Sequence, residues 1–343
     1  MPARRSVPHR VTIQDVAARA GVSAMTVSNV INRKGKTSQA TRDNVQRIIR
    51  EMGYVPSQAA RSLVGAAAAR IGLMYYDADS PFIDTLIAAV ALATAESGLQ
   101  LLMRDVRGID PASVVAAAQG LARSGADGLL LMPPFAEMMA EHPGFAALNV
   151  PAVAIATARG LPGMASVRID NGAAMRDLAC GLIARGRRRI ACVTGPRRHS
   201  DSQARLDGFL QAMAQAGLDV PDAYVVEGGF TFATGLAAAQ ALLTLPERPD
   251  AIMAASDDMA AAVLLAAHRA GLDVPGDLTV TGFDDTSIAM RVWPALTTVR
   301  QPLRAMAGAA VGLLAQGVRA GTGALAGDTV LDFDVIWRES TPA

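Results

Sequence analysis

Four polar or aromatic residues lie where a ligand cleft could form in this chain. Tyr76, Ser256 and Asp284 each end or follow a short apolar run, and Arg205 lies in the stretch Arg-Leu-Asp-Gly-Phe. Short apolar runs bounded by polar residues are typical of buried strands. Ligands of parallel sheets bind outside the carboxyl ends of the strands. These residues are therefore candidates for binding a small polar molecule.

The Asp pairs after two of these runs also have simpler interpretations. An acidic residue after a strand is typical of a helix cap, and we expect Asp257 to cap the following helix. Asp284 and Asp285 make a poor hydrolytic pair, because adjacent residues at a strand end point to opposite faces. The sequence has no nucleophile elbow, phosphate loop or metal-ligand spacing. We therefore expect neither catalysis nor a cofactor nor a metal.

A second candidate region, residues 11–53, is patterned as three short helices. Thr12 stands three residues before Asp15 and predicts a capping box for a first helix, from about Ile13 to Ala20. Gly21 ends that helix. Further hydroxyl caps predict two more helices, which are Ala24 to about Ile31 after Ser23 and Gln39 to Met52 after Ser38. A helix, a short turn with Gly, and two further helices indicate a helix-turn-helix.

The net charge of the chain is divided unevenly. The first 70 residues hold 12 Lys and Arg against 3 Asp and Glu, whereas the other 273 residues hold 20 against 28. A basic arm on a mildly acidic body is the electrostatic footprint of a protein that meets phosphate at one end. A solvated charged face is the alternative for the charge alone.

The second helix has an inner face of Val27, Val30 and Ile31. The other side chains of this region are small or uncharged, and we expect them to lie outward or partly outward: Ala24, Met25, Thr26, Ser28, Asn29 and Asn32. Small side chains and amides suit close approach to base edges.

The helical region closely resembles the headpiece of the LacI/GalR family of bacterial repressors. The resemblance covers Val11-Thr-Ile-Gln-Asp-Val-Ala-Ala-Arg-Ala-Gly-Val-Ser-Ala-Met-Thr-Val-Ser-Asn-Val-Ile-Asn, and then Thr41-Arg, Gly53-Tyr-Val-Pro and Ala59-Ala-Arg-Ser-Leu. It implies a recognition helix at residues 24–31 and a hinge helix at 56–64, whose Leu63 wedges into the minor groove beside Ala60. The implied DNA contacts are Thr12, Ala24, Met25, Thr26, Ser28, Asn29, Asn32, Tyr54, Ala60 and Leu63.

Two positions depart from the family pattern of the headpiece. Asn29 stands where most relatives carry Arg, and Ser57 stands where relatives often carry Asn. Arg suits the two acceptors of guanine, whereas Asn pairs with the donor and acceptor of adenine. We expect a shifted base preference at Asn29, unless its amide only contacts phosphate.

From Arg70 onward short apolar runs alternate with helical patterns, such as Pro81 to Glu96 between Ser80 and Gly98. The predicted strands are Ile71 to Tyr76, Leu99 to Met103, Gly128 to Met132, Ala152 to Ala156, Arg189 to Thr194, Ala251 to Ala255 and Thr279 to Phe283. This alternation indicates parallel sheets with helices on both faces. About 270 residues exceed one comfortable core, so we expect two doubly wound α/β subdomains.

The body also resembles the LacI/GalR family, whose effector domain is similar to periplasmic sugar-binding proteins. The resemblance implies that Arg205 and Asp284 bind polar groups of an effector and that Phe82 and Phe230 flank it. Tyr76 and Ser256 complete the expected site, although sugar-responsive relatives often carry Asn in place of Ser256. A carboxylate and a guanidinium can bind adjacent sugar hydroxyls while an aromatic ring covers the apolar face.

The resemblance implies an all-α helix-turn-helix headpiece at residues 1–56, a hinge helix and linker at 57–69, and an effector and dimerisation domain at 70–343. We expect an N-subdomain at about 70–169 and 301–329 and a C-subdomain at about 170–300 and 330–343. The implied function is a homodimeric repressor of carbohydrate genes, released from palindromic operator DNA by a sugar. A purine-type corepressor mode and a periplasmic-type sugar carrier are the alternatives.

The remaining features indicate a cytoplasmic protein. No stretch reaches the roughly 20 apolar residues of a membrane span, and residues 1–10 lack the apolar core of a signal peptide. We expect Cys180 and Cys192 to be free buried thiols. For His199 we favour a solvated loop position over one beside the cleft.

Overall fold

The computed structural model describes residues 12–31, 37–52, 68–76, 80–106, 108–148, 150–321 and 323–342. The chain divides into two compact units, residues 1–68 and residues 69–343. We call the first unit the headpiece and the second the body, and each is described by itself. Among the described residues, no helix is both long enough and apolar enough to span a membrane.

Three helices form the described part of the headpiece: α1 (Ile13–Ala20), α2 (Ala24–Ile31) and α3 (Gln39–Glu51). The predicted capping box is confirmed, because the Asp15 backbone N–H donates to Thr12 and the Thr12 backbone N–H donates to the Asp15 carboxylate. Gly21 ends α1 with φ of 66°, a conformation that a side chain would strain. The small core consists of Val16, Ala17, Val27, Val30, Val45 and Ile48.

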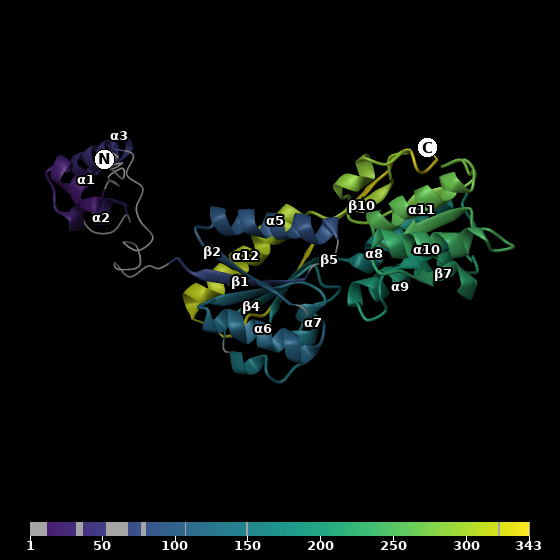
Figure 1. Cartoon of the computed structure of the whole chain (residues 1–343), viewed down its shortest axis with the longest axis horizontal. Coiled ribbons are helices and arrows are strands. Elements are labelled where there is room, and N and C mark those ends of the chain that lie inside the picture. The colour runs from purple at the N-terminus through teal and green to yellow at the C-terminus, as the bar shows by residue number, and fades with distance from the viewer. Residues whose placement is uncertain are drawn as a thin grey trace, which may run out of the picture. The chain divides into compact units, whose positions relative to one another are not determined.

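The first half of the body is a parallel sheet with strand order β11-β5-β4-β3-β1-β2. Its strands are β1 (Arg70–Tyr75), β2 (Gln100–Asp105), β3 (Gly128–Leu131), β4 (Ala152–Ile155), β5 (Ala165–Ile169) and β11 (Asp328–Leu331). Helices α5 (Pro81–Glu96) and α12 (Leu303–Ala320) cover one face, and α6 (Pro111–Arg123) and α7 (Phe135–Ala140) cover the other (Figure 1). A short helical turn, η1 (Ala146–Leu148), follows α7.

The second half is a parallel sheet with strand order β7-β6-β8-β9. Its strands are β6 (Ile190–Thr194), β7 (Val225–Glu227), β8 (Ala251–Ala254) and β9 (Thr279–Thr281). Helices α8 (Asn171–Ala184) and α9 (Ser200–Gln215) pack on one face, and α10 (Phe232–Leu243) and α11 (Asp257–Arg269) pack on the other. Along β6, Ile190 and Cys192 belong to one core and Ala191 and Val193 to the other, as strand periodicity requires.

The chain passes between the two halves more than once. An antiparallel pair in the second half joins β10 (Thr298–Arg300) to β12 (Asp334–Ile336), while β11, only two residues before β12, belongs to the sheet of the first half. Two further short turns, η2 (Asp222–Tyr224) and η3 (Ser287–Met290), complete the described elements. Short connecting segments therefore join the two halves.

The doubly wound fold is confirmed, with differences in detail. The structure adds β5, β7, β10, β11 and β12, which are three to five residues long. Strands this short show too few alternations for a periodicity to emerge from the sequence. Cys192 is buried as expected, but the expectation for Cys180 is wrong because it is exposed on α8.

Candidate functional site

A cavity in the body receives side chains from both halves. All six residues predicted for the effector site line it: Tyr76, Phe82, Arg205, Phe230, Ser256 and Asp284. The first two precede or begin α5 in the first half, and the other four follow strands or lie on α9 in the second half. The fold therefore brings together residues that are up to 208 positions apart in the sequence.

Sequence reasoning missed three charged or titratable residues of this cavity. Arg198, His199 and Asp201 line it at the start of α9. The expectation of a solvated position for His199 is wrong, because its side chain is buried. A run of Arg, Arg, His and Ser without apolar residues resembles an exposed loop, and only the tertiary fold places it against Phe230.

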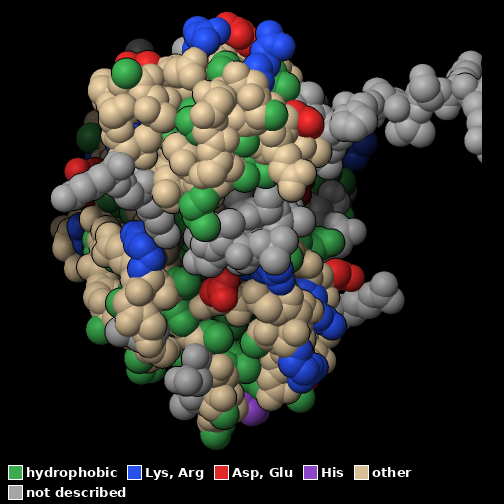
Figure 2. All heavy atoms as spheres, turned by 90° about the vertical axis from the view of Figure 1, so that its left-hand side faces the viewer, with side chains coloured by type: hydrophobic (Ala, Val, Ile, Leu, Met, Phe, Trp, Pro, Cys, Tyr) green, Lys and Arg blue, Asp and Glu red, His purple; other side chains and the backbone are tan. Residues whose placement is uncertain are grey.

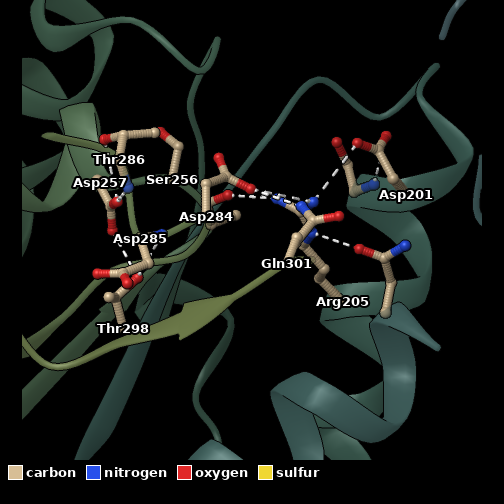
Figure 3. Close-up of polar contacts among 12 residues, drawn as sticks. Asp201, Arg205, Ser256, Asp257, Asp284, Asp285, Thr286, Thr298 and Gln301 are labelled. Atoms are coloured by element: carbon tan, nitrogen blue, oxygen red, sulfur yellow. Dashed lines mark hydrogen bonds and ion pairs between the residues drawn. The ribbon is translucent and has the colours of Figure 1, made fainter. Parts of the chain in front are cut away.

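Arg205 is the centre of the polar network in the cavity (Figure 3). Its Nε donates to Asn171 Oδ1 at 2.9 Å, and its Nη1 donates to the Ala255 carbonyl at 2.6 Å. Its Nη2 lies 3.8 Å from an Asp284 oxygen and 3.9 Å from an Asp201 oxygen. The guanidinium also stacks 3.7 Å from the centre of the Phe283 ring. Arg205 is thus held in one orientation by neutral partners, and its charge faces the carboxyl groups of Asp284 and Asp201.

Asp284 is buried opposite Arg205. Gln301 Nε2 donates to its Oδ1 at 2.7 Å. Burial raises the pKa of Asp284 to about 8, while the nearby Arg205 guanidinium acts in the opposite direction. The backbone is strained here, because Asp284 has φ of 106° and Phe230 has φ of 62°. Strain at two cavity residues indicates a preorganised binding site.

The prediction that Asp257 caps α11 is wrong. The cap is Ser256, whose hydroxyl accepts from the Met259 backbone N–H, while Asp257 begins the helix. The Asp257 carboxylate instead accepts hydrogen bonds from the Thr286 backbone N–H at 2.6 Å and from the Thr298 hydroxyl at 2.6 Å (Figure 3). Burial raises its pKa to about 7. Asp257 thereby fixes the turn that carries Asp284.

Asp285 points away from its neighbour, as expected for adjacent residues at a strand end. Its two oxygens accept from Arg300 Nε and Arg338 Nη2, each at 2.6 Å. Asp284 therefore serves the cavity, and Asp285 ties the loop to β10 and the C-terminal segment. The two carboxylates cannot flank one bond of a substrate.

One side-chain hydrogen bond joins the two halves beside the cavity. The Ser200 hydroxyl at the start of α9 donates to Glu137 Oε1 on α7 at 2.6 Å. Burial raises the pKa of Glu137. This contact links α7 of the first half to α9 of the second half.

The candidate DNA-binding residues of α2 differ in exposure. Met25 is 66% exposed, and Ala24, Thr26 and Asn29 are partly exposed. The expectation of an outward Ser28 is wrong, because this side chain is 7% exposed and lies on the core side of the helix with Val27. Thr12 is exposed at the start of α1. The other predicted contacts, Asn32, Tyr54, Ala60 and Leu63, and the hinge helix at 56–64 lie outside the described residues.

The basic residues of the headpiece are only partly described. Arg19, Arg42 and Arg47 lie on α1 and α3, and Arg47 pairs with Glu51. Seven others fall outside the described residues: Arg4, Arg5, Arg10, Arg33, Lys34, Lys36 and Arg61. On the face of the protein drawn in Figure 2, the described Lys and Arg side chains lie in small, separate groups. The charge excess of this unit is established by the sequence.

Two family models match the chain. Residues 12–57 match "Bacterial regulatory proteins, lacI family", and residues 181–341 match "Periplasmic binding protein-like domain". The HTH-type transcriptional repressor CytR of Escherichia coli (strain K12) is 33% identical over 342 residues, covering 97% of this chain and 96% of CytR. The chain belongs to the LacI family. It is a DNA-binding transcriptional regulator with a periplasmic-binding-protein-like effector domain.

Other LacI-family proteins are similar over most of their length. The ribose operon repressor of Escherichia coli (strain K12) is 37% identical over 297 residues, covering 85% of this chain and 88% of that protein. A structure of the Lac repressor dimer bound to operator and the anti-inducer ONPF has a TM-score of 0.78 at 26% identity, covering 98% of this chain and all of that one. A complex of the regulator CelR with cellobiose has a TM-score of 0.70 at 32% identity, covering 96% and 100%.

Proposed function

We propose that this LacI-family regulator represses carbohydrate-utilisation genes and is released from its operator by a sugar. The observation that carries this proposal is the cavity in which Arg205 and Asp284 face each other beside Phe230. A fixed guanidinium and a carboxyl group bind adjacent hydroxyls, and an aromatic ring covers the apolar face of a sugar. The ribose operon repressor and the CelR complex with cellobiose support a sugar as effector.

On the DNA side, we propose that residues 1–56 bind the operator through α2 and that residues 57–69 form a hinge. The partly exposed Asn29 and the exposed Met25 are available for base contacts. We assign the other contacts to Thr12, Ala24, Thr26, Asn32 and Tyr54, with Leu63 and Ala60 at the operator centre. Phosphate contacts by the basic residues supply most of the affinity for DNA. We place the protein in the cytoplasm, where the chromosome lies.

We propose that the two activities are linked through a homodimer. Two hinge helices at the centre of a palindromic operator need two copies of the chain, as in the Lac repressor dimer bound to operator. The effector binds between the halves of the body and changes their angle, which changes the spacing of the two hinges. An effector that prefers the arrangement of the DNA-free protein lowers the affinity for DNA. DNA then lowers the affinity for the effector by the same factor.

The test is a thermal-shift screen of the full chain with monosaccharides, cellobiose and purine bases, followed by calorimetry. A sugar that binds the folded protein raises its melting temperature. Asp284→Ala lowers the affinity for that sugar by about 1.5 to 3 kcal/mol. Asp177→Ala, which removes an exposed carboxylate on α8, leaves it unchanged. Stabilisation by a purine base alone indicates the corepressor mode, and unchanged sugar affinity in Asp284→Ala contradicts the proposed site.

A further inference from the structure

We propose that His199 is a specificity-determining residue of the effector cavity, whose neutral imidazole forms a hydrogen bond with an effector hydroxyl through Nε2. The inference rests on the proposed function, since it adds one residue and one pH response to the same site. It commits the site to a neutral polyhydroxylated ligand. A phosphorylated sugar would need the opposite charge state of the ring.

The backbone holds His199 in a defined place at the edge of the cavity. His199 is the N-cap residue of α9, and its backbone N–H donates to the Pro196 carbonyl at 3.0 Å. Its ring centre lies 5.8 Å from that of Phe230, an aromatic residue of the same cavity. The side chain is 6% exposed and lines the cavity. The imidazole is therefore oriented before any ligand arrives.

The ring presents a polar atom that no described residue satisfies. His199 Nε2 is buried and has no hydrogen-bond partner in the described part of the chain. Buried polar atoms are nearly always paired, because leaving one unpaired costs free energy. A neutral imidazole can donate or accept at Nε2 according to its tautomer, and a sugar hydroxyl can do either. A ligand hydroxyl in the cavity thus supplies the missing partner.

The charges around the ring favour its neutral form. Burial is the largest cause that lowers the pKa of His199, and the Arg198 and Arg205 guanidiniums lower it further. The Asp201 carboxylate acts in the opposite direction. Other titratable groups that line the same cavity are Tyr76 and Asp284. The pKa lies below the usual 6.5, so the ring is neutral at pH 7 and gains a proton only in acid.

The sign of the pH response follows from this charge state. A hydroxyl partner is matched to the neutral ring, whereas protonation brings a cation next to two arginines. The protonation of His199 therefore leaves the affinity for a neutral sugar unchanged above pH 6.5. The affinity falls as the pH drops through the pKa of His199. A sugar phosphate would respond in reverse, because the anion favours protonation of the ring.

The experiment begins with a thermal-shift screen of sugars that includes D-ribose and cellobiose. The sugar that gives the largest shift is then titrated into the full chain by calorimetry. His199→Ala weakens binding about tenfold at pH 7.5, the effect of losing one hydrogen bond in a buried site. His199→Gln keeps an amide near the Nε2 position and restores affinity to within about threefold. His268→Ala removes an exposed imidazole that stacks on Trp293 and leaves binding unchanged.

The decisive readout is the ratio of the wild-type and His199→Gln dissociation constants between pH 5 and pH 8. The titration of Asp284 affects both proteins and cancels in this ratio. We expect a flat ratio above pH 6.5 and a relative loss of wild-type affinity below it. If His199→Ala binds the sugar as tightly as the wild type, or if the ratio does not change with pH, the inference about His199 is wrong while the proposed function stands. A full chain that binds no sugar overturns the proposed function, and this inference with it.

Discussion

The α2 helix of the headpiece and the Arg205 network of the body show two different ways to build a recognition site. The candidate DNA-facing residues of α2 lie within one eight-residue helix and are at least partly exposed, apart from Ser28. The network joins Asn171 of α8, Arg205 of α9 and Asp284 of the loop after β9, and these three residues are buried. A surface that binds a large partner such as DNA can be formed by one helix. A site for a small ligand needs residues from distant parts of the sequence, held in place by buried contacts.

The largest expected effect tests whether the buried contacts of Arg205 stabilise the body. Arg205→Ala leaves the buried acceptors Asn171 Oδ1 and the Ala255 carbonyl without their donor and removes the cation that faces Asp201, so we expect a loss of about 3 to 5 kcal/mol in the unfolding free energy of the body. Arg197→Ala is the control, because its ion pair with Glu227 is exposed and contributes little. Denaturant titration followed by circular dichroism measures both. Equal stability of the two variants would show that the network is not structural.

The next effect tests the small core behind α2. Ile48 is buried in a headpiece core of six residues, so Ile48→Ala costs about 2 to 4 kcal/mol and unfolds much of this unit. Operator binding is then lost while sugar binding by the body is retained. Gln46→Ala, an exposed change on the same helix, preserves both activities. Retained operator affinity in Ile48→Ala would contradict the role of α2.

A smaller effect tests base reading at the partly exposed Asn29. If its amide lies over a base edge, each half-site favours A·T there, and guanine is disfavoured by about 1 to 3 kcal/mol. Asn29→Arg moves the preference to G·C at that base pair. Selection from randomised operators with both proteins measures the change. Identical preferences would reduce Asn29 to a phosphate contact.

The effect that is smallest per pH unit tests how burial of Asp284 sets the pH dependence of stability. The pKa of Asp284 is raised by burial to about 8 from 3.8, so the folded body favours the protonated form. Stability from this group is fully present below pH 3.8 and declines as the pH rises to about 8. The slope is on the order of 1 kcal/mol per pH unit. Asp284→Asn flattens this decline in unfolding experiments between pH 5 and 8, and an identical slope in the variant would show that Asp284 does not titrate there.

The sequence predicted local features well and the links between them poorly. The capping box at Thr12, the exact bounds of α5 and the strand ends that carry Ser256 and Asp284 all follow from neighbouring residues. The roles of Asp257 and His199 were wrong because each depends on partners far along the chain, such as Thr286, Thr298 and Phe230. Local rules favour a cap or a loop at such positions, and tertiary packing overrides them.

The most direct test of the account is reciprocal linkage between the two sites. Operator affinity is measured with and without saturating sugar, and sugar affinity is measured with and without operator, at one salt concentration. The operator is the sequence recovered by selection. We predict that sugar weakens operator binding and that operator weakens sugar binding by the same factor. Asp284→Ala raises the sugar concentration that is needed to release the operator. Operator affinity that is unchanged at saturating sugar would contradict the proposed coupling.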